Sequence, residues 1–123
     1  MGVIKGKVHV GLEDDQLDFL SRPDTPKVKV SRRDLPLALS RGLNGGTTVA
    51  GTLMVADACL AKTPLSLPLF VTGGIGGVHR EGESSMDVSA DLVEMGRSST
   101  AVVSAGIKSI LDIGRSLEYL VNS

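Results

Sequence analysis

Residues 69–77 have the sequence LFVTGGIGG, and residues 100–108 have the sequence TAVVSAGIK. Each stretch is a short apolar run that ends in glycine, a pattern typical of a buried strand that enters a tight turn. Segments with helical periodicity stand before and after both. Strands that alternate with helices predict an α/β fold, with three layers (α/β/α) around a mixed, largely parallel sheet. We expect residues 1–123 to form a single domain.

The rest of the chain continues this alternation. Residues 3–12 predict a strand or hairpin, and residues 28–31 predict a brief strand. Apolar periodicity and capping residues predict a last helix that opens at Ser109, and four earlier helices over 14–20, 35–40 (capped by Asp34), 47–60 and 90–97 (capped by Ser89).

Two of these predicted helices have an apolar face. In the 47–60 helix the face consists of Val49, Leu53, Ala56 and Leu60, and in the last helix it consists of Ile110, Ile113, Leu117 and Leu120. Residues 60–69 contain two prolines and predict an irregular junction. Residues 73–86 have no regular period, and a loop of that length in a compact domain is usually functional or disordered.

The composition excludes several classes of protein. With 13 basic and 14 acidic residues, no Trp, one Tyr and two Phe, the chain has neither the charge nor the aromatic residues of a nucleic-acid-binding protein. The single cysteine, Cys59, cannot form an internal disulfide and is expected to be a buried thiol. No apolar stretch approaches the ~20 residues that span a bilayer, and nothing in the sequence resembles a cleavable secretion signal. We expect a cytoplasmic protein without a membrane partner, and an organellar location stays open.

Lys108 is the first candidate for chemistry. In parallel α/β sheets, ligands bind beyond the carboxyl ends of the strands, where residues 73–87 and 106–108 are expected to meet. A lysine there is a possible nucleophile, but it attacks a carbonyl only as the neutral amine, which burial or a helix N-terminus favours. The alternative is a solvated surface lysine.

Three segments are candidate anion sites. The glycines of residues 73–77 offer backbone amides, and His79 and Arg80 follow them with positive charge. The run is neither a P-loop nor a dinucleotide-binding motif, and a flexible loop remains possible. Residues 42–48 are either a second cradle or a plain helix-entry loop. The basic cluster of Lys29, Arg32 and Arg33 either grips a phosphate or coats the surface.

The acidic residues Asp87 and Asp91 flank Ser89 near the start of a predicted helix, where carboxylates are expected as caps. Asp87 alone would also suit a hard cation, Mg²⁺ or Mn²⁺, held mostly by waters. A structural zinc site is excluded, because the chain has one cysteine and two distant histidines.

Five segments, taken together and in this order, carry a resemblance: 29–36 (KVSRRDLP), 44–50 (NGGTTVA), 70–80 (FVTGGIGGVHR), 86–92 (MDVSADL) and 105–112 (AGIKSILD). They resemble successive blocks of the pseudouridine-5'-phosphate glycosidases, also called the indigoidine synthase A-like family. The resemblance covers most of the chain.

The resemblance implies a carbon–oxygen lyase that reversibly cleaves the C–C glycosidic bond of pseudouridine 5'-phosphate to uracil and ribose 5-phosphate. A lysine imine with C1 of the opened sugar acts as the electron sink. Lys108 matches the Schiff-base lysine and Asp87 the Mn²⁺ ligand. The residues that match substrate-binding positions are Lys29, Val49, Ser89, Ala90 and Asp91. A homotrimer is also implied.

The chain departs from the family pattern in length. Family members are more than twice as long and carry a proton-donor glutamate in an N-terminal segment, for which neither Glu13 nor any other acid here matches. We therefore expect a truncated central segment with weak or absent turnover. Two alternatives stay open, which are a catalytically silent fragment that acts through oligomer association and a small phosphate-binding α/β module.

Overall fold

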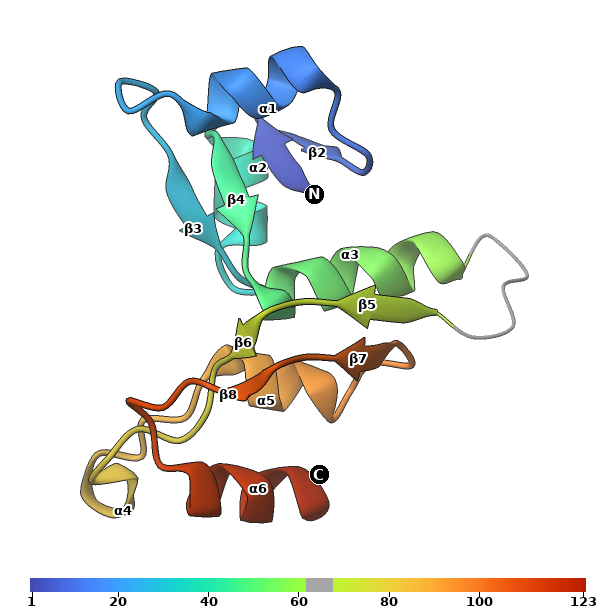
Figure 1. Ribbon diagram of the computed structural model, residues 1–123. Coiled ribbons are helices and arrows are strands. Elements are labelled where there is room, and N and C mark those ends of the chain that lie inside the picture. Colours follow the sequence, from blue (N-terminus) through green and yellow to red (C-terminus); the bar gives the residue numbers. More distant parts are fainter. Residues whose placement is uncertain (62–67) are drawn as a thin grey trace. The chain divides into compact units, whose positions relative to one another are not determined.

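The computed structural model describes residues 1–61 and 68–123, and the chain divides into two compact units, Met1–Thr52 and Leu53–Ser123 (Figure 1). Most of the junction predicted over residues 60–69 lies outside the described residues. No described helix combines the length and apolar character needed to traverse a bilayer.

A four-stranded mixed sheet organises the first unit, in the order β2-β1-β4-β3. Strands β1 (Gly2–Ile4) and β2 (Lys7–His9) form the predicted hairpin, and β1 also pairs antiparallel with β4 (Gly45–Thr47). Strand β3 (Val28–Val30) runs parallel to β4. The chain reverses at Lys5 and Gly6, both at positive φ, which is the geometry of the two-residue turns that match the twist of paired strands.

Strand β4 differs from the sequence-based prediction. The Gly45-Gly46 pair has low strand propensity, so the sequence predicts a loop followed by a helix from residue 47. The pair is nevertheless suited to this place, because a Cβ on Gly45 would overlap the carbonyl of Val28 and lie 2.7 Å from Cγ2 of Val30. The two strands can approach only because no side chain stands between them.

Three helices belong wholly or partly to this unit: α1 (Asp14–Ser21), α2 (Leu35–Ser40) and the start of α3 (Val49–Leu60). The predicted bounds are confirmed to within a residue or two. On the predicted apolar face of α3, Leu53 is buried and Val49, Ala56 and Leu60 are half-buried, and the other buried positions of the helix are Ala50, Gly51, Thr52 and Val55. Cys59 is exposed, so the expectation of a buried thiol is wrong.

Asp34 precedes α2 but does not cap it through its side chain. Its Oδ2 instead accepts hydrogen bonds from the backbone N and the Oγ of Ser31, at 3.0 and 2.5 Å. These two donors hold the pKa of the Asp34 carboxyl below its ordinary value, because they favour the charged form.

The lowered pKa of Asp34 predicts a pH-dependent contribution to stability. The folded-state pKa lies below the unfolded one, so the stabilisation is present above the unfolded value and is lost as the pH falls through the folded value. Urea unfolding of the parent and of Asp34→Asn should differ most near neutral pH and converge in acid. In the Ser31→Ala background, which lacks one of the two donors, Asp34→Asn should lower the free energy of unfolding by less than it does in the parent. A gap that does not change with pH would contradict this account.

The second unit contains two small parallel sheets. Strand β5 (Leu69–Val71) pairs with β7 (Ala101–Val103), and β6 (Gly74–Ile75) pairs with β8 (Gly106–Ile107). The helices are the rest of α3, α4 (Gly82–Ser85), α5 (Ala90–Met95) and α6 (Ile113–Val121). The α/β class with mixed sheets is confirmed. Among the described strands, three pairings are parallel and two antiparallel, divided over three sheets.

The two runs predicted to be buried strands form strands, but they are not buried. Leu69, Val71 and Val103 are 61%, 66% and 53% exposed. Side chains alternate between the two faces of a strand, and only Phe70 and Val102 turn to the partly covered side. An apolar run predicts a strand from composition alone, and burial depends on what packs over it.

Helix α6 begins at Ile113, four residues later than predicted, because Asp112 caps it by accepting a hydrogen bond from the Arg115 amide at 3.0 Å. Its predicted apolar face is exposed, with Ile113 at 49% and Leu117 at 54%, and the residue buried in α6 is Ser116. The loop predicted over residues 73–86 contains both β6 and α4. Ser89 caps α5 as predicted.

Candidate functional site

The glycine run and the segment that carries Lys108 lie side by side. Gly74 is in register with Gly106 and Ile75 with Ile107 in the β6–β8 ladder. The ladder is extended at both ends, since the Ala105 amide donates to the Gly73 carbonyl at 2.9 Å and the Lys108 amide to the Ile75 carbonyl at 3.2 Å. The predicted meeting of these two loops at the ends of parallel strands is therefore present (Figure 1).

Lys108 follows the last residue of β8, and its aliphatic stem lies against Gly74. A Cβ on Gly74 would lie 3.1 Å from Cγ and 3.8 Å from Cε of Lys108. The residue is exposed rather than buried, so of the two features named above as favouring a neutral amine, burial is not present here. The predicted helix mouth is also displaced, because a turn closed by the Leu111 amide on the Lys108 carbonyl, at 2.9 Å, separates Lys108 from α6.

Ser89 and Asp91 are held against the glycine run by hydrogen bonds. The Gly76 amide donates to Oδ2 of Asp91 at 2.9 Å, and the Ser89 amide donates to the Gly77 carbonyl at 3.1 Å. Ser89 Oγ in turn accepts from the Asp91 amide at 3.2 Å, and Ala90 is the exposed first residue of α5. Because Gly76 donates to a carboxylate of the same chain, its amide is not free for the anion that the sequence pattern predicted.

Asp87 lies opposite His79, which is the second residue after the glycine run. The His79 amide donates to the Asp87 carbonyl at 3.0 Å, and Nδ1 of His79 lies 3.7 Å from Oδ2 of Asp87. Both side chains are more than half exposed. The described residues contain no group of three His, Cys, Asp or Glu side chains that could hold a metal. One carboxylate with one imidazole fits only a cation that keeps most of its waters.

Lys29 and Val49 belong to the first unit. Lys29 is exposed on β3 in register with Gly46 of β4, so the basic cluster and the glycines of residues 42–48 are neighbours. Arg32 and Arg33 are exposed after this strand, and Val49 is the half-buried first residue of α3. The two alternatives for residues 42–48, a cradle or a helix-entry loop, both missed that much of the segment is strand β4.

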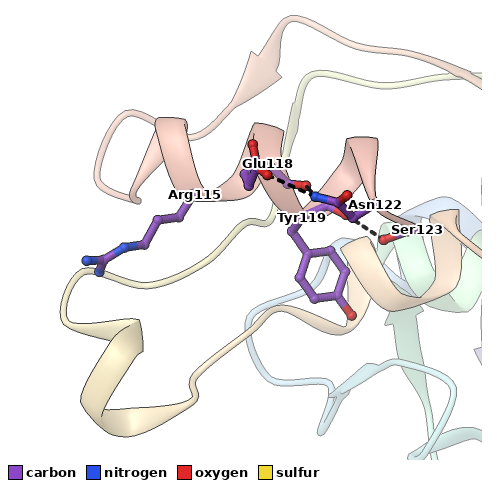
Figure 2. A pocket seen from close by; sticks show the side chains of 5 residues that line it. All are labelled: Arg115, Glu118, Tyr119, Asn122 and Ser123. Atoms are coloured by element: carbon purple, nitrogen blue, oxygen red, sulfur yellow. Dashed lines mark hydrogen bonds between the residues drawn. The ribbon is translucent and has the colours of Figure 1, made fainter.

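An open hollow of about 500 Å³ lies along α6 and the two residues that follow it (Figure 2). It is lined by Arg115, Glu118, Tyr119, Asn122 and Ser123. Arg115 pairs with Glu83 of α4, whereas Asn122 Nδ2 donates to the carbonyl and Oε1 of Glu118, and Ser123 Oγ donates to the Tyr119 carbonyl. None of the predicted site residues lines this hollow, so we do not place the site there.

Comparison with known proteins shows the family of the chain. The family described as indigoidine synthase A like protein matches residues 1–123. The chain belongs to the indigoidine synthase A-like family. The resemblance inferred from the five sequence segments is therefore confirmed.

Relatives in this family carry related names. A pseudouridine-5'-phosphate glycosidase of Cupriavidus pinatubonensis is 54% identical over 120 residues, which are 98% of this chain and 36% of the relative. A pseudouridine-metabolizing bifunctional protein of Schizosaccharomyces pombe is 53% identical over 98% of this chain and 15% of its own length. This chain therefore spans little more than a third of the glycosidase and less of the bifunctional protein.

Two solved structures in the family have the same fold over this region. The prealnumycin C-glycosynthase AlnA, solved in complex with ribulose 5-phosphate, is 40% identical with a TM-score of 0.86. An indigoidine synthase A-like protein of Thermotoga maritima is 36% identical with a TM-score of 0.83. Each match covers 98% of this chain and 38% of the solved chain.

Three residues have contacts in the candidate site that could not be predicted from the sequence, and one of them, Ser116, is not among the sequence-based candidates. Gly74 supports the Lys108 stem, His79 faces Asp87, and Ser116 bonds to the backbone beyond the glycine run. His79 was singled out for its charge but not as the companion of Asp87. Ser116 had one available signal, since it is a polar residue within a predicted amphipathic helix.

Proposed function

We propose that this chain carries the lysine-imine part of a pseudouridine-5'-phosphate glycosidase reaction. The observation on which the proposal depends is the position of Lys108, which leaves β8 and extends across Gly74 beside the strip of residues 74–79. Asp91 and Asp87 approach the same strip at Gly76 and His79. The names of relatives that are about 50% identical over 98% of the chain support pseudouridine 5'-phosphate as the substrate.

The chemistry requires a neutral amine and an open sugar. Lys108 Nζ attacks the C1 aldehyde of ring-opened ribose 5-phosphate, and loss of water gives an imine. In the synthetic direction, the imine carbon accepts the electron pair of uracil C5, which forms the C–C bond as C5 loses its proton, and the 4-hydroxyl of the sugar then replaces the Lys108 nitrogen at C1, which closes the ring and frees the amine. In the cleavage direction, the Lys108 nitrogen replaces the ring oxygen at C1, the electron pair of the C–C bond returns to uracil together with a proton at C5, and water hydrolyses the resulting imine to release Lys108. No residue of this chain is assigned as the acid that supplies the proton.

The remaining residues bind and orient the substrate in this proposal. In the second unit, Ser89, Ala90 and Asp91 contact the substrate. For Lys29 and Val49, which belong to the first unit, substrate contact stays a prediction from the family resemblance. Asp87 with His79 would hold Mn²⁺, which supplies positive charge toward substrate oxygens when it is bound. The exposure of Asp87 and the lack of a third ligand group among the described residues fit a cation that keeps several waters.

Reductive trapping tests the function. The chain is incubated with ribose 5-phosphate and borohydride, and its peptides are weighed by mass spectrometry. We expect one pentitol phosphate adduct, on the peptide that contains Lys108. Lys7, an exposed lysine on β2, is the internal control and should stay unmodified. Binding of ribose 5-phosphate without an adduct would favour the phosphate-binding module, and neither binding nor an adduct would favour the silent fragment.

Manganese binding gives a separate prediction. Mn²⁺ should broaden the NMR signals of Asp87, His79 and their neighbours, because the unpaired electrons relax nearby nuclei. Asp87→Asn should abolish this broadening by removing the charged ligand, and His79→Ala should weaken it. Asp24→Asn, at an exposed carboxylate of the other unit, is the matched control and should leave it unchanged. Equal broadening in Asp87→Asn would exclude Asp87 as the ligand.

A further inference from the structure

Ser116 is a buried hydroxyl in the middle of α6 that no step above uses. Its exposed fraction is 0%. Its Oγ accepts a hydrogen bond from the Val78 amide at 2.8 Å and donates one to the Asp112 carbonyl at 2.5 Å. One side-chain atom therefore joins the residue after the glycine run to the residue that caps α6.

Val78 and Asp112 lie at one end of a set of hydrogen bonds that connects residues 75–78 to residues 108–112. At the near end, the Lys108 amide bonds to the Ile75 carbonyl at 3.2 Å, and at the far end the Asp112 amide bonds to the Val78 carbonyl at 2.9 Å. Residues 108–112 are thus bonded to residues 75–78 at both ends. Ser116 completes the far end, because it satisfies the Val78 amide that faces this junction.

Ser116 packs closely against Gly77. A Cβ on Gly77 would overlap Ser116 Oγ and would lie 2.8 Å from Cγ2 of Ile107, the residue before Lys108. Gly77 therefore lies close to both Ile107 and Ser116. A shift of α6 at this point would be passed through Gly77 to the segment that carries Lys108.

We propose that Ser116 is a positioning residue for Lys108, a role that rests on the function proposed above. Its hydroxyl fixes residues 108–112 on residues 75–78, and this fixes where the Lys108 stem crosses Gly74. Without the hydroxyl, the Val78 amide is left buried with no acceptor, which favours separation of the two segments. The amine then loses its defined position, and small displacements of a reacting group lower rates strongly.

The test compares Ser116→Ala with a conservative variant at the same position and with a variant just beyond the end of α6. Ser116→Thr keeps the hydroxyl and its bond to the carbonyl four residues earlier. Ser123→Ala removes the corresponding bond at an exposed position, where Ser123 Oγ donates to the Tyr119 carbonyl at 2.6 Å. Borohydride trapping is measured against ribose 5-phosphate concentration, which separates the maximal rate from the half-saturating concentration. Amide hydrogen exchange of residues 74–78 and 106–112 is measured on the same samples.

Ser116→Ala should lower the maximal trapping rate by about 10- to 100-fold with little change in the half-saturating concentration. In Ser116→Ala, amide hydrogen exchange should be faster than in the parent at residues 74–78 and 106–112, and it should be unchanged in β5 and β7. Ser116→Thr should recover most of the rate, and Ser123→Ala should match the parent. If the parent and Ser116→Ala form the borohydride-trapped adduct at the same rate, the role of Ser116 is wrong and the proposed function still stands. A parent that forms no adduct would overturn the proposed function, and the role of Ser116 with it.

Discussion

Replacing Lys108 by methionine or alanine should abolish the borohydride-trapped adduct completely. An imine requires a primary amine on the attacking residue, and neither replacement supplies one. Methionine keeps an unbranched stem that can still lie against Gly74, whereas alanine removes it. Loss of the adduct in both variants would therefore assign the effect to the amine rather than to the packing of the stem.

The same variants should remain folded. Lys108 is exposed, so its replacement should change the free energy of unfolding by less than about 0.5 kcal/mol. Urea unfolding and adduct mass are measured on the same preparations, with Lys7→Ala as the matched control at another exposed lysine. An adduct of the same mass in Lys108→Met would mean that a different amine reacts, and the assignment of Lys108 would be wrong.

The order of elements could be predicted because each signal is local. Ser89 caps α5 and Asp14 opens α1 where the sequence places them, since caps and apolar periodicity are determined by neighbouring residues. Strand β4 could not be predicted in this way. Its Gly45-Gly46 pair has no strand propensity, and the space that it leaves matters only once Val28 and Val30 lie alongside.

Burial was the least predictable property, because it depends on what covers a side chain. Leu117 and Val71 have the apolar character of core residues but are exposed, whereas Ser116 is polar and completely buried. The amino-acid type gives the preference of a side chain for the interior. Whether a side chain is in fact buried depends on packing partners that are distant in the sequence.

The candidate site was predicted in part. The meeting of the glycine run with the Lys108 segment follows from two apolar runs that each end in glycine, because parallel strands place their following turns together. The interactions within it could not be predicted. Whether the Gly76 amide is open to an anion or bonded to Asp91 depends on a contact fifteen residues apart in the chain.

Gly76→Ala should be among the most destabilising single changes in the glycine run. A Cβ there would overlap Ser89 Oγ and lie 2.9 Å from Oδ2 of Asp91, the atom that accepts from the Gly76 amide. We expect the free energy of unfolding to fall by about 1–3 kcal/mol, as in other overpacked sites. Gly73→Ala is the matched control, because a Cβ on Gly73 meets nothing within 4 Å. That variant should change stability by less than about 0.5 kcal/mol.

A double-mutant cycle assigns the loss to its cause. Ser89→Gly removes the side chain that the new methyl would meet, and glycine at a helix cap costs only a few tenths of a kcal/mol relative to serine. If overlap with Ser89 causes the loss, Gly76→Ala combined with Ser89→Gly should be more stable than the sum of the two single changes predicts. Strict additivity would contradict this cause, and it would leave the Asp91 hydrogen bond as the interaction that Gly76→Ala disrupts. In either case the glycine is required because its amide, rather than a side chain, faces α5.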